Sequence, residues 1–579
     1  MVNFVNYATT IIAIIIVLHV LYGEIIQKKA ERYINNENYN WQPNEKQMRI
    51  FVCILLVCAT ALRMWKLGQV PEMMNQDSAL AAIEAKALWL HGTDRFGMRY
   101  PVYFVAWGFS QMSVLMSYLM IPFFELFGMS ELTIRIPCFF MSVIGLAVLY
   151  LLCKKIFGKM SALVILVLAA VNPWHFAQSR WALDANLLPH FFILGVFFLC
   201  KGIKLHKYLY VSMVFFALCH YCYAVSLYIV PLYLLILSIY YLHKKAVSIK
   251  QVLVSLCIYL LISLPFYVAM LINTFGYPTI ETPWFTIPYC EASTRMGDVL
   301  FFSSDIAGQL VRNIKAFVSL VVFQDIGKIW HGVPGFGTMY YAMVPFTFVG
   351  IYAVYRLFRE KVEKREEYMA IIVWGIVSIL AGIVTFEVNV NRINIIHYVQ
   401  IILIGLGIHY TIKKCRKASI LIGGCVLLLG GVYVGTYFTS YAEAYRADFR
   451  MDFRRALEAV KEKDCGKYYI TPITDDPQAR TVSEIDAIYI HDLDIPYIQG
   501  KTSLNHGSEE APYKEKYRYV YPEELVIDAK EDAVYIILTE DEGMFPKESF
   551  YIEHYGAFGV VSPLEADGEQ NTAADKEQD

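Results

Sequence analysis

The segment SQMSVLMSYLMIPFFELFG, residues 110–128, decides how this chain is threaded through a membrane. It is apolar enough to suggest a span, but it contains Pro122 and Glu125. Counting it as a full crossing would also move the basic cluster that follows it to the side opposite the other basic clusters. A carboxylate is unfavourable in hydrocarbon. We therefore expect this segment to lie in the outer interface or to be re-entrant.

The composition is that of a polytopic membrane protein. Of 579 residues, 57% are hydrophobic and 18% are charged, which is too apolar for a soluble chain of this length. The net charge of −2 provides no basic excess for nucleic acid. The 12 cysteines form no CxxC pair or Cys/His cluster, so neither a zinc site nor a disulfide framework is indicated. The first apolar stretch lacks a cleavage site and is expected to be a retained span.

Twelve membrane-spanning helices are expected, because a bilayer core of about 30 Å requires about 20 apolar residues per helix. The candidate spans lie near residues 7–24, 50–66, 133–152, 161–178, 187–201, 208–222, 225–242, 251–271, 340–357, 368–386, 395–411 and 419–438.

Basic residues predict the orientation of these spans, since short connections rich in Lys and Arg are normally cytoplasmic. Six such clusters alternate with polar connections: Lys28/Lys29/Arg32/Lys46/Arg49, Lys154/Lys155/Lys159, Lys201/Lys204/Lys207, Lys244/Lys245/Lys250, Arg356/Arg359/Lys361/Lys364/Arg365 and Lys413/Lys414/Arg416/Lys417. Both termini are then external. Four connections also open on the outer face: 67–132, 172–191, 272–339 and 387–398.

After about residue 440 the composition becomes polar. The stretch YRADFRMDFRRALEAVKEKD, residues 445–464, predicts an amphipathic helix, and KYYITPI (467–473), AIYI (487–490) and AVYIILTE (533–540) predict strands. We expect an all-α membrane protein of about twelve spans with a small extracytoplasmic α/β domain. The predicted divisions are an N-terminal span and cytoplasmic loop (1–48), a transmembrane domain (49–440), the external domain (441–562) and a disordered acidic tail (563–579).

Asp77 is the first candidate for chemistry. It stands near the start of NQDSALAAIEAKALWLHG, residues 75–92, a run of good helix formers. In a purely structural role, Asp77 would be the N-cap of this helix and would satisfy free backbone N–H groups. In a catalytic role, it would be a general base that faces an external cavity.

Charged residues on the other external connections share this face: Arg135, Arg180, Asp184 and Arg392. A guanidinium suits a phosphate oxygen, so each arginine is a candidate to hold an anionic leaving group. The alternatives are that Arg135 snorkels to lipid phosphates and that Arg180 pairs with Asp184, four residues on. His175, His190 and His397 lie at similar depths and are lesser candidates, because a lone His near a helix end is more often structural.

Five segments, taken in order, resemble the integral-membrane GT-C glycosyltransferases, and most of all the branch of protein O-mannosyltransferases and lipid A aminoarabinose transferases. They are VPEMMNQDSA, HGTDRFGMRYPVYFVAWGFSQMSVLMSYLMIPFFELFGMSELTIRIP, VNPWHFAQSRWALDANLLPHF, VPGFGTMYY and NVNRINIIHY. The resemblance covers roughly residues 50–440. It implies a polyprenyl-phosphate sugar as donor, a catalytic acidic residue on the first external loop, and inverting transfer on the extracytoplasmic side.

Residue by residue, the resemblance makes Asp77 the base, as the first member of the family's Asp-Glu pair. It makes Arg135 a donor-phosphate ligand and matches Asp184 to an acidic residue after the SRWAL-like run. The second member of the pair is Ser78 here instead of Glu, which bears on acceptor choice.

The expected partners are a polyprenyl-phosphate sugar, an envelope glycan, lipid or protein acceptor, and the lipids of the cell membrane. Ser78, His175 and His397 are weaker candidates for substrate contacts. No cofactor is expected. Asp77 and Asp184 could share a divalent metal, but the sequence presents no set of three or four hard ligands. A lipid or solute transporter, or a non-catalytic scaffold, is the alternative.

Overall fold

The computed structural model describes residues 2–26, 43–72, 75–106, 110–290, 305–385, 387–463, 465–472, 479–499 and 511–564. It forms two compact units. One comprises Met1–Asp94 and Met98–Asp448, and the other comprises Arg95–Gly97 and Phe449–Asp579. The first is called the membrane unit below. Most of the predicted acidic tail, from residue 565 on, and the basic residues at 28–32 lie outside the described ranges.

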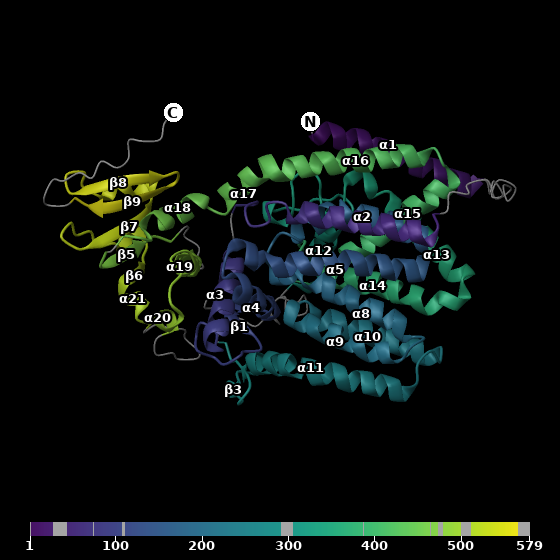
Figure 1. The fold of residues 1–579 in the computed structure, drawn as a ribbon, viewed down its shortest axis with the longest axis horizontal. Coiled ribbons are helices and arrows are strands. Elements are labelled where there is room, and N and C mark those ends of the chain that lie inside the picture. The colour runs from purple at the N-terminus through teal and green to yellow at the C-terminus, as the bar shows by residue number, and fades with distance from the viewer. Residues whose placement is uncertain are drawn as a thin grey trace. The chain divides into compact units, whose positions relative to one another are not determined.

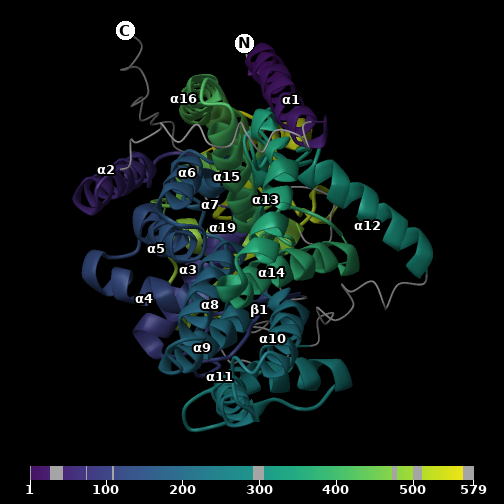
Figure 2. The same ribbon diagram turned by 90° about the vertical axis from the view of Figure 1, so that its right-hand side faces the viewer.

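The membrane unit is helical (Figure 1). Its helices are α1 (Val2–Ile26), α2 (Glu45–Met64), α3 (Gln76–His91), α4 (Leu115–Phe127), α5 (Glu131–Phe157), α6 (Lys159–Ala170), α7 (Pro173–Gln178), α8 (Leu188–Gly202), α9 (Lys207–Cys222), α10 (Ser226–His243), α11 (Ile249–Phe275), α12 (Ile306–Val321), α13 (Phe346–Glu360), α14 (Arg365–Val384), α15 (Ile396–Lys414), α16 (Ala418–Thr436) and α17 (Ala442–Asp448). Seen from the end, α8, α14 and α15 lie inside, and α1, α2 and α11 lie at the periphery (Figure 2).

Every predicted span corresponds to helix in this unit. Within the described part of the chain, nine helical stretches are long and apolar enough to cross a membrane. The remaining three predicted spans correspond to α6 with α7, α9 and α15. The prediction of one continuous helix over 161–178 is wrong, because Asn172 accepts a hydrogen bond from the His175 N–H and Pro173 starts the separate helix α7.

The segment 110–128 does not form a span. It gives strand β2 (Ser110–Met112), paired antiparallel with β1 (Phe104–Ala106), and then the 13-residue helix α4. Thirteen residues rise about 20 Å, which is too short for a hydrocarbon core of about 30 Å. α3, β1 and α4 gather at the end of the bundle where α2 ends and α5 begins (Figure 1). The prediction that this segment does not cross the membrane therefore agrees with the fold.

Connections predicted to be external meet at one end of the bundle. The Asn172 side chain donates to the Thr338 carbonyl at 3.2 Å, and the Asn394 side chain donates to the Ala185 carbonyl. These bonds join the 172–191 connection to both the 272–339 and the 387–398 connections.

The basic connections meet one another in the same way. Lys154 pairs with Glu45 at 3.3 Å, and the Lys364 ammonium donates to the Lys155 carbonyl at 3.1 Å. The alternation of basic and polar connections therefore predicted correctly which of these ends lie together.

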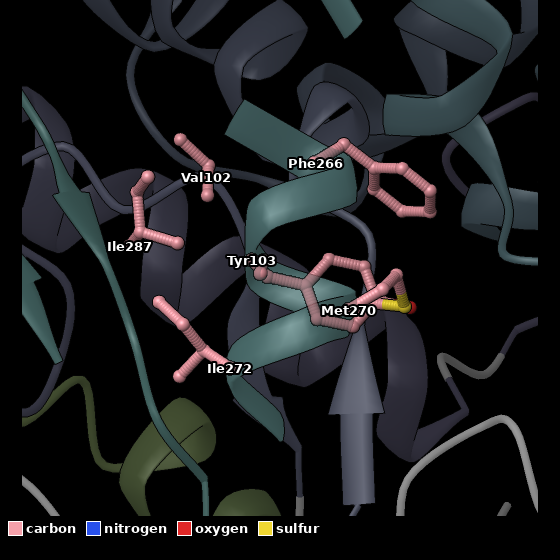
Figure 3. Close-up of a cluster of buried hydrophobic side chains, with 7 residues drawn as sticks. Val102, Tyr103, Phe266, Met270, Ile272 and Ile287 are labelled. Atoms are coloured by element: carbon pink, nitrogen blue, oxygen red, sulfur yellow. The ribbon is translucent and has the colours of Figure 1, made fainter. Parts of the chain in front are cut away.

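The connection between α3 and β1 packs against the C-terminal end of α11. Val102 and Tyr103 join a buried cluster with Phe266 and Met270 of α11 and with Ile287 of β4 (Figure 3). β3 (Ile280–Glu281) and β4 (Thr286–Ile287) form a short hairpin, and its Thr286 carbonyl accepts a bond from the Val102 N–H at 3.0 Å. This packing fixes the loop that follows α3.

α13 and α15 approach so closely that only glycine fits at two contacts. A Cβ at Gly350 would collide with the Leu403 carbonyl, and a Cβ at Gly407 would collide with the Phe346 carbonyl. Small residues permit such close helix contacts in membranes, where dispersion forces replace the hydrophobic effect.

The second unit contains a five-stranded sheet in the order β6-β5-β7-β9-β8. Three neighbouring strands run parallel to one another: β6 (Tyr517–Tyr519), β5 (Lys467–Ile470) and β7 (Ala533–Leu538). The next strand, β9 (Phe558–Pro563), is antiparallel to both of its neighbours, β7 and β8 (Phe550–Tyr555). Its helices are α18 (Met451–Val460), α19 (Ala479–Ile490), α20 (Ile495–Gln499) and α21 (Tyr513–Lys516).

One predicted strand of this unit is wrong. AIYI, residues 487–490, forms the end of α19, where Val482, Ile485 and Ile488 recur at helical spacing and are buried. Packing of this helical face outweighs the local strand propensity. The predicted helix 445–464 is interrupted at Arg450, whose φ is 55°.

Gly350→Ala should lower the melting temperature of the purified protein, because the added methyl group pushes α13 away from α15. Overpacking of this kind typically costs about 1–3 kcal/mol. Gly424→Ala on α16 is the matched control, since a Cβ there meets nothing within 4 Å. Equal melting temperatures for the two variants, measured by thermal denaturation in detergent, would contradict the close packing.

Candidate functional site

Asp77 lies in the first turn of α3. The N-cap is Asn75, whose side chain accepts a bond from the Ser78 N–H at 3.0 Å. The structural alternative that made Asp77 the cap is therefore wrong. Asp77 is half-buried, whereas the next five residues of the helix are buried. The Asn75 side-chain amide donates to its carboxylate at 3.5 Å.

Ser78 joins α3 to the connection that carries Asp184. Its side chain is fully buried, and its hydroxyl lies 2.6 Å from both the Ala182 carbonyl and the Asn75 side-chain oxygen. Asp184 begins the short 3₁₀ helix η2 (Asp184–Asn186), where its carboxylate accepts a bond from the Ala185 N–H. Two half-buried carboxylates, Asp77 and Asp184, thus flank the contact between Ser78 and Ala182.

The connection between α14 and α15 also contacts this region. The fully buried Asn394 donates to the Ala185 carbonyl, one residue after Asp184. Arg392, two residues earlier, is half-buried, and its guanidinium donates to the Glu387 carbonyl at 3.4 Å. Residues one or two positions from Asp77, Asp184 and Arg392 are therefore in contact, although their connections lie far apart in the sequence.

Arg135 does not snorkel to the lipid surface, because it is only 2% exposed. Its guanidinium donates to the Leu67 carbonyl at 2.7 Å and to the Pro71 carbonyl at 2.8 Å. It also pairs with Glu131 at 3.3 Å, one turn earlier on α5. Arg135 therefore binds the backbone of the segment that leads from α2 towards Asp77.

Arg180 binds the same segment. Its guanidinium donates to the carbonyls of Arg63, Lys66 and Val70, so the predicted pairing with Asp184 is replaced by backbone contacts. The guanidinium also lies over the Phe438 ring, 5.0 Å from its centroid. Burial lowers the pKa of Arg180, and the carbonyl dipoles around the charge compensate for the lost water.

A third buried arginine, Arg63, was missed by the sequence analysis. Its fully buried guanidinium donates to the carbonyls of Ala169 and Ala170 at the end of α6 and contacts His175 Nδ1 at 3.2 Å. The sequence does place Arg63 near the end of an apolar span, where a charge is unfavourable unless it has hydrogen-bond or ionic partners. That position could have marked it as a candidate.

The candidate histidines belong to buried hydrogen-bond networks. His175 Nε2 lies 3.1 Å from the Tyr398 hydroxyl, which also contacts His190 Nδ1 at 2.8 Å. His397 Nδ1 lies 3.0 Å from the Gln400 side-chain oxygen. All three rings are at most 2% exposed, so their positions favour the structural alternative over direct substrate contact.

In the described ranges, no three His, Cys, Asp or Glu side chains cluster as a metal ion would require. The half-buried residues at the site are two carboxylates and one guanidinium. Such a set can accept a proton and stabilise a developing negative charge.

Comparisons with known proteins give a family model and several solved structures that this chain resembles. Residues 111–272 match the family model described as dolichyl-phosphate-mannose-protein mannosyltransferase. The crystal structure of ArnT from Cupriavidus metallidurans bound to undecaprenyl phosphate superposes with a TM-score of 0.57 at 11% identity, over 90% of this chain and 99% of that chain. The Archaeoglobus fulgidus oligosaccharyltransferase is similar with a TM-score of 0.44 at 14% identity, over 75% and 61%. Curated proteins give no match.

Ser78→Glu should lower the melting temperature far more than Ser78→Ala. The alanine variant loses one buried hydrogen bond, worth about 1 kcal/mol. The glutamate variant forces a longer, charged side chain against the Ala182 carbonyl. Gln76→Glu is the matched control, because it adds a carboxylate to the same turn at a half-buried position. If thermal denaturation gave Ser78→Glu and Gln76→Glu the same melting temperature, that result would contradict the packing described for Ser78.

Proposed function

We propose, from the premise that this chain is a membrane glycosyltransferase of the GT-C class, that it moves a sugar from a polyprenyl-phosphate donor to a hydroxyl of an envelope acceptor. The fold it shares with ArnT, whose structure holds undecaprenyl phosphate, supports a lipid-phosphate donor. The observation that supports this assignment of residues is the contact of the Ser78 hydroxyl with the Ala182 carbonyl, because Ser78 follows Asp77 and Ala182 lies two residues before Asp184.

Asp77 is the proposed general base. An acceptor hydroxyl gives its proton to the Asp77 carboxylate while its oxygen forms a bond to the anomeric carbon. The bond from that carbon to the phosphate oxygen breaks on the opposite face, so the configuration inverts. The electron pair leaves with the lipid phosphate. A correctly placed base of this kind typically contributes about 10²–10⁴-fold in rate.

Asp184 and Arg392 have complementary roles in this mechanism. Asp184 lies beside the same contact and can orient the acceptor hydroxyl or stabilise positive charge that develops on the sugar ring. Arg392 offers a guanidinium whose planar donors suit the oxygens of the departing phosphate. It is the predicted phosphate ligand that the structure leaves partly accessible.

The site is proposed to face the extracytoplasmic side of the cell membrane. The basic connections gather at the opposite end of the bundle, where Lys154, Lys155 and Lys364 lie together, and such clusters are normally retained in the cytoplasm. A donor anchored in the bilayer by its own lipid needs no soluble nucleotide on that outer side.

Asp77→Asn should leave a folded protein whose transfer rate is about 10²–10⁴-fold lower, since the amide cannot take the proton. The assay follows release of lipid phosphate from labelled polyprenyl-phosphate sugars by purified protein. Glu443→Gln is the matched control, because it removes an exposed carboxylate on α17. A transporter, the alternative class, would move the donor without breaking its sugar-phosphate bond. Undiminished transfer by the folded Asp77→Asn variant would remove Asp77 from this role.

Arg392→Gln should raise the donor KM by about 10- to 100-fold, because a hydrogen bond to a charged group is worth about 1.5–3 kcal/mol. Arg392→Lys should recover part of the loss, since it restores the charge but not the planar donor pair. Steady-state kinetics over a range of donor concentrations measure both. An unchanged donor KM in Arg392→Gln would place the phosphate elsewhere.

A further inference from the structure

Three buried arginines surround the connection between α2 and α3. We propose that Arg63, Arg135 and Arg180 form an arginine clamp, which positions Asp77 relative to Asp184 and does not bind the donor phosphate. The proposal rests on the proposed function, in which Asp77 is the base. It assigns Arg135 and Arg180 a role different from the one suggested by the family resemblance.

Backbone carbonyls occupy the donors of two of these arginines. Arg180 binds the carbonyls of residues 63, 66 and 70, and Arg135 binds those of residues 67 and 71. Five carbonyls within nine residues are therefore held by two guanidinium groups. The bonds to residues 66, 67, 70 and 71 measure 2.7 to 3.0 Å between nitrogen and oxygen, within the range of good hydrogen bonds.

Of these five carbonyls, only that of Arg63 belongs to the last four of α2, which ends at Met64 and whose final carbonyls have no partner within the helix. The Lys66 carbonyl also accepts bonds from the Gln69 and Val70 N–H groups. The chain then turns sharply at Lys66, whose φ of 51° lies in the left-handed region. Leu67 and Pro71 are buried, so water cannot replace the missing donors freely.

Arg63 links the same turn to α6. Its guanidinium binds the carbonyls of Ala169 and Ala170, where α6 ends, while its own carbonyl accepts from Arg180. Arg63 thus satisfies carbonyls at the end of α6, and Arg180 satisfies the Arg63 carbonyl in the last turn of α2. A cation at a helix C-terminus also interacts favourably with the helix dipole.

The clamp acts on both carboxylates. Arg180 lies two residues before Ala182, whose carbonyl contacts Ser78, and four residues before Asp184. The segment held by Arg135 and Arg180 ends at Pro71, six residues before Asp77. A shift of that segment relative to Arg180 would therefore change the position of Asp77 relative to Asp184, and misplacement by about 1 Å can cost about 10²-fold in rate.

The degree of burial distinguishes the three arginines of the clamp from an arginine that could bind phosphate. Arg63 and Arg180 are fully buried and Arg135 is 2% exposed, whereas Arg392 is half-buried. The planar fork of arginine spans two or three carbonyls at once. Lysine, with a single compact ammonium, cannot do so.

The test compares Arg135→Lys and Arg180→Lys with Arg49→Lys, an exposed position on α2 that serves as the control. For each purified full-length variant, kcat, donor KM, melting temperature and the Kd for polyprenyl phosphate are measured. The clamp predicts that kcat falls by about 10²-fold while the Kd for polyprenyl phosphate stays within about threefold of the wild-type value. A Kd weakened tenfold or more with kcat retained would make these arginines phosphate ligands and overturn the proposal.

Gly68→Ala provides a second test that removes no charge. A Cβ at Gly68 would lie 3.0 Å from the Leu132 Cβ, so the methyl group should push the clamped segment away from α5. We expect the same signature of lowered kcat with unchanged phosphate affinity, even where an arginine variant fails to fold. Unchanged kcat in this variant would overturn the proposal. A wild-type protein that binds polyprenyl phosphate but releases none from any donor sugar would instead defeat the proposed function.

Discussion

Hydrogen bonds from buried guanidinium groups to backbone carbonyls are the interaction on which the catalytic end of this protein depends. A helix that ends inside a packed membrane protein leaves carbonyls that neither water nor lipid can satisfy. Arg63 and Arg180 satisfy these groups for α6 and α2, and each is itself kept in place by the carbonyls it binds. The charge is costly to bury, but the dipoles around it offset that cost. The turn after α2 can therefore take an irregular path towards Asp77.

The connection from residue 178 to residue 186 brings the other elements to this turn. Its Arg180 side chain binds the segment after α2, its Ala182 carbonyl contacts Ser78 of α3, and its Ala185 carbonyl accepts from Asn394. Three connections from one end of the bundle thus meet on one short stretch of backbone. Since backbone atoms move less than long side chains, these contacts hold the two segments that carry Asp77 and Asp184.

The sequence was sufficient for the parts of the fold that charge and hydropathy control. Lys and Arg clusters predicted which connections share an end, and Pro122 and Glu125 predicted that residues 110–128 do not cross. The roles of Arg135 and Arg180 were beyond this method, because an arginine near a helix end looks the same in sequence whether it binds phosphate or a carbonyl. α12 was also not predicted, since an amphipathic helix within 272–339 resembles a polar connection. AIYI was assigned to a strand because its propensity is local, whereas the packing of α19 is not.

The exchange of the family's Glu for Ser78 is understandable from the same contacts. A second carboxylate next to Asp77 would repel it and would have to be desolvated or shared with a substrate. Here the position is fully buried, and a short hydroxyl joins α3 to the Ala182 carbonyl. The side chain at position 78 therefore contributes rigidity in place of charge. Position 78 therefore supplies no second carboxylate next to Asp77, unlike the Asp-Glu pair that the resemblance implies.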